Sequence, residues 1–272
     1  MITAGIDMGA RSIKVVLLEH APASAPVVRV LTRHLLFPES LDLAVAAERA
    51  FDGALAHTGL TADALTRVVA TGAARALVSF AQAEVTEMTA AARGAFSLFP
   101  AVRTVIDVGA EEARAIRLQA DGRVADFAAN EKCAAGAGAF AESMARALQW
   151  SLADFGVAAL RSQQLIPMNA QCTVFAESEV VSLIHAATPR EDIARAVLEA
   201  VASRICAMAR RVGIEEAVVL VGGMAHTLGF VQALQDALAV GQLHLPEAPE
   251  YVAALGAAWI AAEQVARNAE PA

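Results

Sequence analysis

The chain has 272 residues, of which 57% are hydrophobic and only 5% are aromatic, and its formal net charge is −8. This length is enough for two lobes that each bury a core, and we expect two. The 21 Lys and Arg residues are scattered, which argues against a nucleic-acid partner because phosphate backbones are bound by concentrated positive charge. No apolar run reaches the roughly 18 residues of a membrane span, so we expect no membrane partner. The N-terminal residues show no leader features, and three cysteines are too few for a disulfide framework, so we expect a cytoplasmic protein.

Two segments that start 100 residues apart repeat one pattern. The segments are GIDMGARSIKVVLL, residues 5–18, and VIDVGAEEARAIRL, residues 105–118. Each consists of an apolar strand ending in Asp-x-Gly, a tight turn and a second strand with β-branched residues, which predicts a hairpin. The repeat therefore favours two related lobes. It aligns Asp7 with Asp107, Gly9 with Gly109, and Lys14 with Arg114.

Asp-x-Gly at the end of a strand has a chemical use when it occurs twice. The backbone N–H groups of a glycine turn can approach phosphate oxygens closely, and a carboxylate at the strand end can hold hydrated Mg²⁺. A single Asp-Gly turn is common hairpin punctuation, but the duplication with matched flanks favours a phosphate site. The repeat therefore predicts a triphosphate bound by Asp7 and Gly9 in one copy and by Asp107 and Gly109 in the other.

The stretch NEKCAAGAGAFAESMARAL, residues 130–148, places Cys133 ahead of a glycine-rich turn and an amphipathic helix. Cys172 in turn opens CTVFAESEVVSLI. Both thiols are expected at helix N-termini, where the helix dipole favours the thiolate. Gly136, Gly138 and Ala141 also fit a loose dinucleotide-binding pattern, but no strand is evident in QWSLADFGVAAL, where the pattern requires one. The two glycines remain candidates for contact with nucleotide phosphates.

Three further segments complete the pattern. Cys206, in ASRICAMARR, lies among apolar residues at helical spacing and is expected to be a small buried side chain. In EEAVVLVGGMAHTLGFVQALQDAL we expect a strand at 218–221 and a helix from about Gly229. Gly222 and Gly223 lie between them, and the flat ring of a ligand could lie against their backbone. The C-terminal PEYVAALGAAWIAAE predicts a core helix. Gly256 in it has two explanations that stay open: a second helix crosses closely at this glycine, or the segment is an ordinary Ala-rich packing helix.

Asp7-x-Gly9, Asp107-x-Gly109, Gly222-Gly223 and ALGAA, in this order, resemble the phosphate, adenosine and connecting-helix motifs of the actin, sugar-kinase and Hsp70 ATPase superfamily. The resemblance implies an α/β fold of two ribonuclease-H-like lobes, with ATP in the cleft between them. The expected boundaries are an N-terminal lobe at 1–98, completed by a C-terminal helix at 250–268. The second lobe, at 99–249, carries the cysteines and the adenosine motif.

Within this superfamily, NEKCAAGAGAF, CTVFAESEVVSLI and VTEMTAAARGA resemble the ATPase subunits of benzoyl-CoA reductase and the activators of 2-hydroxyacyl-CoA dehydratases. The chain is most similar in these motifs to the smaller ATPase subunit of benzoyl-CoA reductase, the D subunit. The resemblance implies an enzyme that couples MgATP hydrolysis to electron transfer from ferredoxin. It implies a heterodimer with a homologous ATPase subunit, a shared [4Fe–4S] cluster, and partner subunits that reduce benzoyl-CoA.

The resemblance also implies roles for individual residues. The candidate catalytic residues are Asp7, Asp107 and Glu111. The two aspartates are expected to bind Mg²⁺ and position the phosphates. Glu111 is expected to orient the attacking water or to act as a base. Cys133 and Cys172 are the expected ligands of the cluster, two from each subunit. The expected nucleotide-binding residues are Gly9, Ser12, Lys14, Gly109, Gly136, Gly138, Gly222 and Gly223.

The chain departs from its relatives at three places. Ala10 follows Gly9 where many relatives have a hydroxyl residue, for which Ser12 is a possible substitute. The second turn reads Gly-Ala-Glu-Glu where activators usually show Gly-Gly-Gln-Asp, and Ala91 stands where activators often carry histidine. These departures fit a specialised subunit that pairs with a non-identical one.

Two other functions remain open. A homodimeric activator of a 2-hydroxyacyl-CoA dehydratase shares the fold, the cluster and the nucleotide chemistry. A sugar or N-acetylglucosamine kinase shares the fold, but no sugar-binding run is evident, and Cys133 and Cys172 would have no role.

Overall fold

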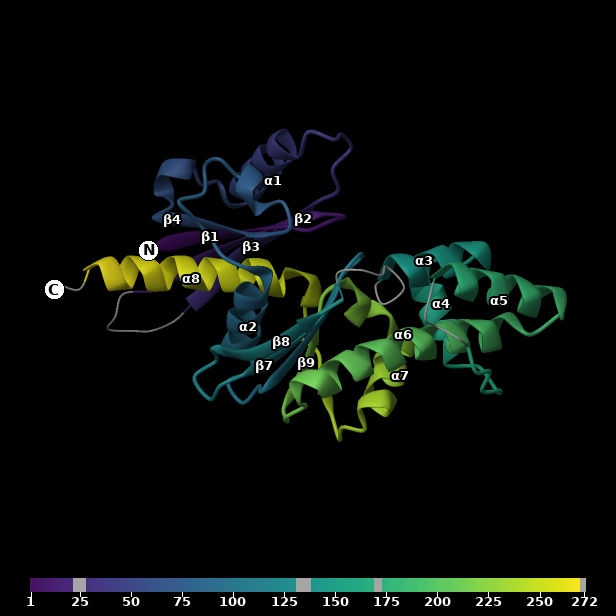
Figure 1. Ribbon diagram of the computed structural model, residues 1–272. Coiled ribbons are helices and arrows are strands. Elements are labelled where there is room, and N and C mark those ends of the chain that lie inside the picture. Colours follow the sequence, from purple (N-terminus) through teal and green to yellow (C-terminus); the bar gives the residue numbers. More distant parts are fainter. Residues whose placement is uncertain (22–27, 131–137, 169–172, 270–272) are drawn as a thin grey trace. The chain divides into compact units, whose positions relative to one another are not determined.

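The computed structural model describes residues 1–21, 28–130, 138–168 and 173–269. The chain folds as two compact units, each with a five-stranded mixed sheet and α-helices (Figure 1). Residues 121–124 belong with the first unit, where Gly122 lies against the ring of Phe96. The first unit comprises Met1–Pro100, Asp121–Val124 and Glu250–Ala272, and the second comprises Ala101–Ala120 and Ala125–Pro249.

The sheet of the first unit has the strand order β3-β2-β1-β4-β5. β1 pairs antiparallel with β2 and parallel with β4, while β2 is also antiparallel to β3. The elements are β1 (Ile2–Met8), β2 (Ile13–His20), β3 (Val28–Leu36), α1 (Leu43–Thr58), β4 (Arg67–Gly72), β5 (Ala83–Glu84), α2 (Glu87–Leu98) and α8 (Val252–Ala269), with 3-10 helices at Ala62–Ala64, Arg75–Leu77 and Pro249–Tyr251.

Alternation along the strands gives this sheet two apolar faces. Ile6 and Val15 lie in a cluster with the buried side of α1, whereas Val16 and Val69 pack with small residues of α8. Because successive side chains of a strand point to opposite faces, Asp7 lies on the α8 face. Helices therefore cover the sheet on both sides.

The C-terminal segment forms the expected core helix. A side chain at Gly256 of α8 would collide with the Ala90 carbonyl of α2, and one at Gly94 of α2 would collide with the Val252 carbonyl of α8. The two helices thus cross with their backbones in close contact, which confirms the crossing considered for Gly256. No helix within the described residues is long and apolar enough to cross a membrane.

The second unit repeats the strand arrangement of the first. Its sheet has the order β10-β9-β6-β7-β8, in which β6 is antiparallel to β7 and parallel to β9. The elements are β6 (Thr104–Val108), β7 (Ala113–Leu118), β8 (Val124–Ala129), α3 (Gly138–Ala147), α4 (Leu152–Ala159), α5 (Thr173–His185), α6 (Arg190–Val212), β9 (Val218–Val221), the 3-10 helix Gly223–His226, α7 (Leu228–Leu238) and β10 (Leu243–His244).

One face of this second sheet packs against the helices of its unit. Ile106, Val108 and Leu220 share a buried cluster with residues of α3, α6 and α7. Cys206 belongs to this cluster: it is 4% exposed, and its Sγ donates a hydrogen bond to the Ala237 carbonyl over 2.9 Å. The expectation of a small buried side chain at Cys206 is confirmed.

The two hairpins have the same register. Asp7 lies opposite Lys14 in β1–β2, and Asp107 lies opposite Arg114 in β6–β7, so the alignment made in the sequence holds in the strand pairing. In both copies four residues connect the two strands, 9–12 in the first and 109–112 in the second. The predicted hairpin repeat is confirmed.

Candidate functional site

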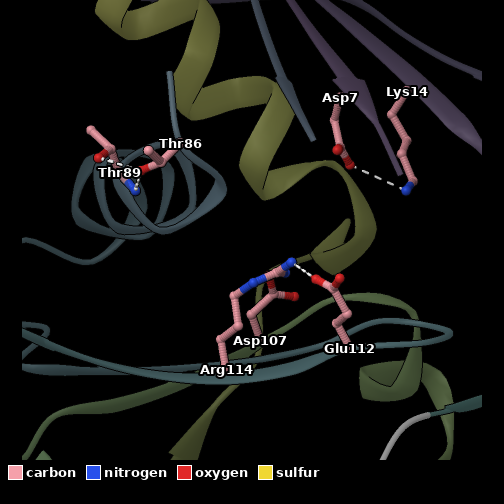
Figure 2. Close-up of polar contacts among 7 residues, drawn as sticks. All are labelled: Asp7, Lys14, Thr86, Thr89, Asp107, Glu112 and Arg114. Carbon is pink, nitrogen blue, oxygen red and sulfur yellow. Dashed lines mark hydrogen bonds and ion pairs between the residues drawn. The ribbon is translucent and has the colours of Figure 1, made fainter. Parts of the chain in front are cut away.

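The first Asp-x-Gly turn brings a carboxylate and an ammonium together. Lys14 Nζ lies 3.2 Å from Asp7 Oδ2, and both side chains are largely buried, with 14% and 11% of their surface exposed (Figure 2). A Cβ atom at Gly9 would lie 2.7 Å from Lys14 Nζ, so the small residue leaves room for the ammonium. Ser12, at the end of the turn, is 7% exposed. This turn can offer oxygen ligands to a cation and positive charge to a phosphate.

The second turn carries a three-membered ionic group that was not predicted. Arg114 NH1 lies 3.3 Å from Asp107 Oδ2, and its NH2 pairs with Glu112 (Figure 2). Gly109 N–H donates to the Glu112 carbonyl over 2.9 Å, which closes the turn. Glu111, the residue expected to handle water, is exposed, whereas Glu112 is half-buried. The sequence alone does not show which of the adjacent Glu111 and Glu112 pairs with Arg114.

Helix α3 begins directly against this second turn. The N–H groups of Gly138 and Ala139 donate to the carbonyls of Gly109 and Ala110 over 2.9 and 2.7 Å. The first N–H groups of a helix lack partners within the helix, so the turn satisfies two of them. A Cβ atom at Gly138 would meet the Gly109 carbonyl at 3.0 Å and Met224 at 3.1 Å. Gly138 thus allows close packing of three segments of this unit.

The predicted strand-glycine-helix segment is confirmed. β9 ends at Val221, and α7 begins at Leu228, one residue before the expected start. Gly222 has φ +87°, and a Cβ atom there would press on the Val108 carbonyl and lie 2.7 Å from Asp107 Oδ1. A Cβ atom at Gly223 would meet nothing within 4 Å. Gly222 therefore holds the end of β9 against the aspartate of β6, while Gly223 presents an open backbone.

The structure adds Gly72, which the sequence reasoning missed. It ends β4, has φ +95°, and a Cβ atom there would lie 2.5 Å from the backbone of Met8. It is the counterpart of Gly222, since β4 pairs parallel with β1 as β9 pairs with β6. The signal was present in the similar strings VVATG and VVLVG. Each unit therefore ends the strand beside its aspartate with a glycine.

The start of α2 lies in the segment VTEMTAAARGA that contributed to the resemblance. Thr86 caps the helix by accepting a hydrogen bond from Thr89 N–H over 3.3 Å, and the two hydroxyls lie 2.8 Å apart (Figure 2). A threonine before the first helical residue is a strong start signal. Ala91, in the same helix, is fully buried.

The predicted cluster ligands Cys133 and Cys172 lie outside the described residues, as does Gly136. The helices that follow them in the chain are described: α3 begins at Gly138, and α5 begins at Thr173, the residue after Cys172. No group of three or more His, Cys, Asp or Glu side chains that could hold a metal occurs within the described residues. Mg²⁺ needs no such group, because it commonly binds through one or two carboxylates, phosphates and waters.

Comparison with known proteins decides the family. Residues 4–261 match the BadF/BadG/BcrA/BcrD ATPase family. The chain belongs to this family. The ATPase character and the family expected from the motifs are both confirmed.

Individual relatives of this BadF/BadG/BcrA/BcrD ATPase refine the picture. This chain is 38% identical to an activator of lactoyl-CoA dehydratase from Anaerotignum propionicum, over 97% of its own length and 98% of the relative. It is 31% identical to the D subunit of the benzoyl-CoA reductase from Thauera aromatica, over 94% of this chain and 92% of that relative. The expectation that the D subunit would be the more similar relative is therefore wrong. The cysteine and Asp-x-Gly motifs on which the expectation was based are short segments of this chain, whereas these identities are measured over almost all of it.

Solved structures confirm the fold class. The activator of the 2-hydroxyisocaproyl-CoA dehydratase from Clostridium difficile, solved with bound ADPNP, superposes with a TM-score of 0.89 at 30% identity and covers 100% of this chain and 99% of its own. A ROK hexokinase from Thermus thermophilus, 15% identical with a TM-score of 0.54 over 98% of this chain and 100% of its own, shares the fold alone. The family ATPase thus has the α/β fold of the actin and sugar-kinase superfamily.

Proposed function

We propose that this ATPase is the activator of a 2-hydroxyacyl-CoA dehydratase. It hydrolyses MgATP in the cytoplasm and thereby drives an electron from ferredoxin to the dehydratase. The observation that carries the proposal is 38% identity to a dehydratase activator over 97% of the chain, together with two Asp-x-Gly hairpins in equal register. A solved dehydratase activator with the same fold contains bound ADPNP. This was the alternative to the benzoyl-CoA reductase subunit, and the comparisons favour it.

The first turn is proposed to bind Mg²⁺ and the terminal phosphates. Asp7 provides a carboxylate at a strand end, and Lys14, 3.2 Å from it, provides a positive charge that phosphate oxygens attract. Gly9 and Ser12 are proposed to donate from a backbone N–H and a hydroxyl in the same turn. Mg²⁺, when bound, would supply charge neutralisation and orientation of the phosphates. The donor set fits this ion because Mg²⁺ prefers oxygen ligands and few protein carboxylates.

The second turn is proposed to position the hydrolytic water and the nucleotide. Arg114 holds Asp107 and Glu112, which leaves the exposed Glu111 as the carboxylate available to orient water or accept its proton. Gly109 offers its turn to the phosphates. Because the first N–H groups of α3 already donate to this turn, Gly138 is proposed to act by close packing.

The adenosine is proposed to lie against the open backbone of Gly223, with Gly222 fixing the end of the strand beneath it. Cys133 and Cys172 are proposed to hold a [4Fe–4S] cluster together with the same pair from a second copy of the chain. Such a cluster, which usually takes four thiolates, would supply a one-electron carrier. Cys172 precedes α5 directly in the chain, and a helix N-terminus favours the thiolate form of cysteine.

A second candidate is the ATPase subunit of a benzoyl-CoA reductase. The chain is 31% identical to such a D subunit, and its Gly-Ala-Glu-Glu turn and the buried Ala91 depart from the pattern of activators. This candidate requires a non-identical ATPase subunit. The two candidates therefore differ in whether the chain alone forms a working dimer.

The test is reconstitution with a purified 2-hydroxyacyl-CoA dehydratase, a reduced ferredoxin and MgATP under anaerobic conditions. We expect dehydratase activity that depends on ATP hydrolysis and falls at least tenfold with Asp7→Asn. An Asp63→Asn variant, changed on an exposed 3-10 helix, is the matched control and should behave as wild type. Unchanged ATPase activity in Asp7→Asn would refute the role of the first turn.

A further inference from the structure

The side chain of Thr71 has no role in the site described so far. It lies in β4, is fully buried, and its Oγ1 has no hydrogen-bond partner. An unpaired hydroxyl is disfavoured in a protein interior because it has lost its hydrogen bonds to water. Two other buried threonines are paired: Thr3 Oγ1 donates to the Ala258 carbonyl over 2.9 Å, and Thr104 Oγ1 donates to the Glu215 carbonyl over 2.8 Å.

Strand register places Thr71 beside the first Asp-x-Gly turn. Asp7 in β1 is the partner of Lys14 in β2 and of Thr71 in β4, so the three residues lie at one level on adjacent strands. Paired residues of neighbouring strands point to the same face, and Asp7 and Thr71 are therefore side-chain neighbours on the α8 face. Gly72 fixes this level, because its close approach to the Met8 backbone holds the end of β4 against β1.

The second unit provides an internal comparison. Asp107 in β6 has Val221 as its partner in β9, at the position that corresponds to Thr71. Valine and threonine have nearly the same shape, and Val221 is buried without an unpaired hydroxyl. Packing at this position therefore does not require threonine. The hydroxyl occurs in the unit whose aspartate is paired with a lysine.

We propose that Thr71 is a positioning residue for Asp7. When Lys14 turns toward a bound phosphate, the Thr71 hydroxyl donates a hydrogen bond to the Asp7 carboxylate and keeps it oriented toward Mg²⁺. Thr71 acts through Asp7 and needs no contact with the nucleotide, which agrees with its complete burial. The inference rests on the proposed binding of MgATP at the first turn.

The test compares ATP affinity with and without Mg²⁺, measured by calorimetry, together with thermal unfolding of the ligand-free chain. Thr71→Val should keep or raise the unfolding temperature, and the affinity gained from Mg²⁺ should fall about tenfold, as expected for a lost hydrogen bond to a charged group. Thr71→Ser, which keeps a hydroxyl, should restore the gain. Thr3→Val is the matched control: it removes the hydrogen bonds of Thr3 with the Ala258 carbonyl and the His20 ring, so it should lower the unfolding temperature and leave the Mg²⁺ gain intact.

A full Mg²⁺ gain in Thr71→Val would overturn the inference and leave the proposed function standing. A Thr71→Val protein that loses stability as Thr3→Val does, without a selective loss of the Mg²⁺ gain, would overturn it as well. If the wild-type chain gains no ATP affinity from Mg²⁺, the proposed function itself fails, and the inference fails with it.

Discussion

Replacing Gly222 with alanine tests how the second aspartate is held in place. Gly222 has φ +87° and ψ 171°, a backbone region that is populated almost solely by glycine. A Cβ atom there would press on the Val108 carbonyl and lie 2.7 Å from Asp107 Oδ1. Alanine must therefore either strain the backbone at the end of β9 or displace the Asp107 side chain.

The size of the effect follows from these two costs. Forcing a residue with a side chain into this region costs roughly 1–3 kcal/mol. Because a backbone carbonyl and the end of a strand cannot move aside easily, we expect the upper end, about 3 kcal/mol of unfolding free energy. For a unit of this size, that corresponds to a fall of roughly 6–12 °C in unfolding temperature.

The assay is calorimetric unfolding of Gly222→Ala beside Gly223→Ala. A Cβ atom at Gly223 would enter open space, so its alanine variant should unfold within about 1 °C of wild type while adenine nucleotides bind more weakly. Gly222→Ala should lose both stability and nucleotide affinity. A Gly222→Ala protein as stable as Gly223→Ala would refute the argument that the strand end needs glycine.

Three further predictions concern the ion pairs of the second turn, His34 in β3 and Gly138 at the start of α3. Arg114→Met removes the guanidinium that lies 3.3 Å from the Asp107 carboxylate and should cost roughly 3 kcal/mol in urea unfolding. Glu112→Gln changes a side chain that is 37% exposed and should cost under about 1 kcal/mol. Equal losses in the two variants would contradict the argument that the Arg114–Asp107 pair is the stronger one. Burial, and then the charge of the neighbouring His57, lower the pKa of His34 in the folded chain. The folded chain therefore binds the proton less readily than the unfolded chain, in which the pKa is about 6.5. The contribution of neutral His34 to the free energy of unfolding is complete above that value and is lost as pH falls through the lower folded pKa. His34→Gln should therefore lose less unfolding temperature between pH 7.5 and 5.5 than wild type, and an identical loss would refute this. Gly138→Ala should cost about 1–2 kcal/mol by crowding its two neighbours, and a neutral result would show that the contact can relax.

The hairpins were predictable because strand and turn signals are local. The 100-residue repeat aligned Asp7 with Asp107, and the strand pairing has the same register in both copies. The strand at 218–221 and the glycines after it were equally visible, since an apolar run that ends in two glycines is a local pattern.

The missed features depend on pairing between distant segments. Gly72 becomes important only once β4 lies beside β1, and the sequence alone does not show that neighbour. The choice of Glu112 over Glu111 as the partner of Arg114 depends on how a four-residue turn closes. The ranking of relatives likewise required comparison over the whole chain, because the motifs that carried the resemblance are short segments, whereas the identities of 38% and 31% are measured over almost the whole chain.

The most direct test of the central claim is an iron count on the chain purified alone under anaerobic conditions, with electron-paramagnetic-resonance spectra recorded with and without MgATP. An activator of the proposed kind should be a homodimer with about four irons per pair of chains, as expected for one [4Fe–4S] cluster. Its reduced spectrum should change on addition of MgATP, and Cys172→Ala should lose the iron while remaining folded. An iron-free chain that phosphorylates a sugar would contradict the account, and a chain that takes up iron only with a second, non-identical ATPase subunit would favour the benzoyl-CoA reductase.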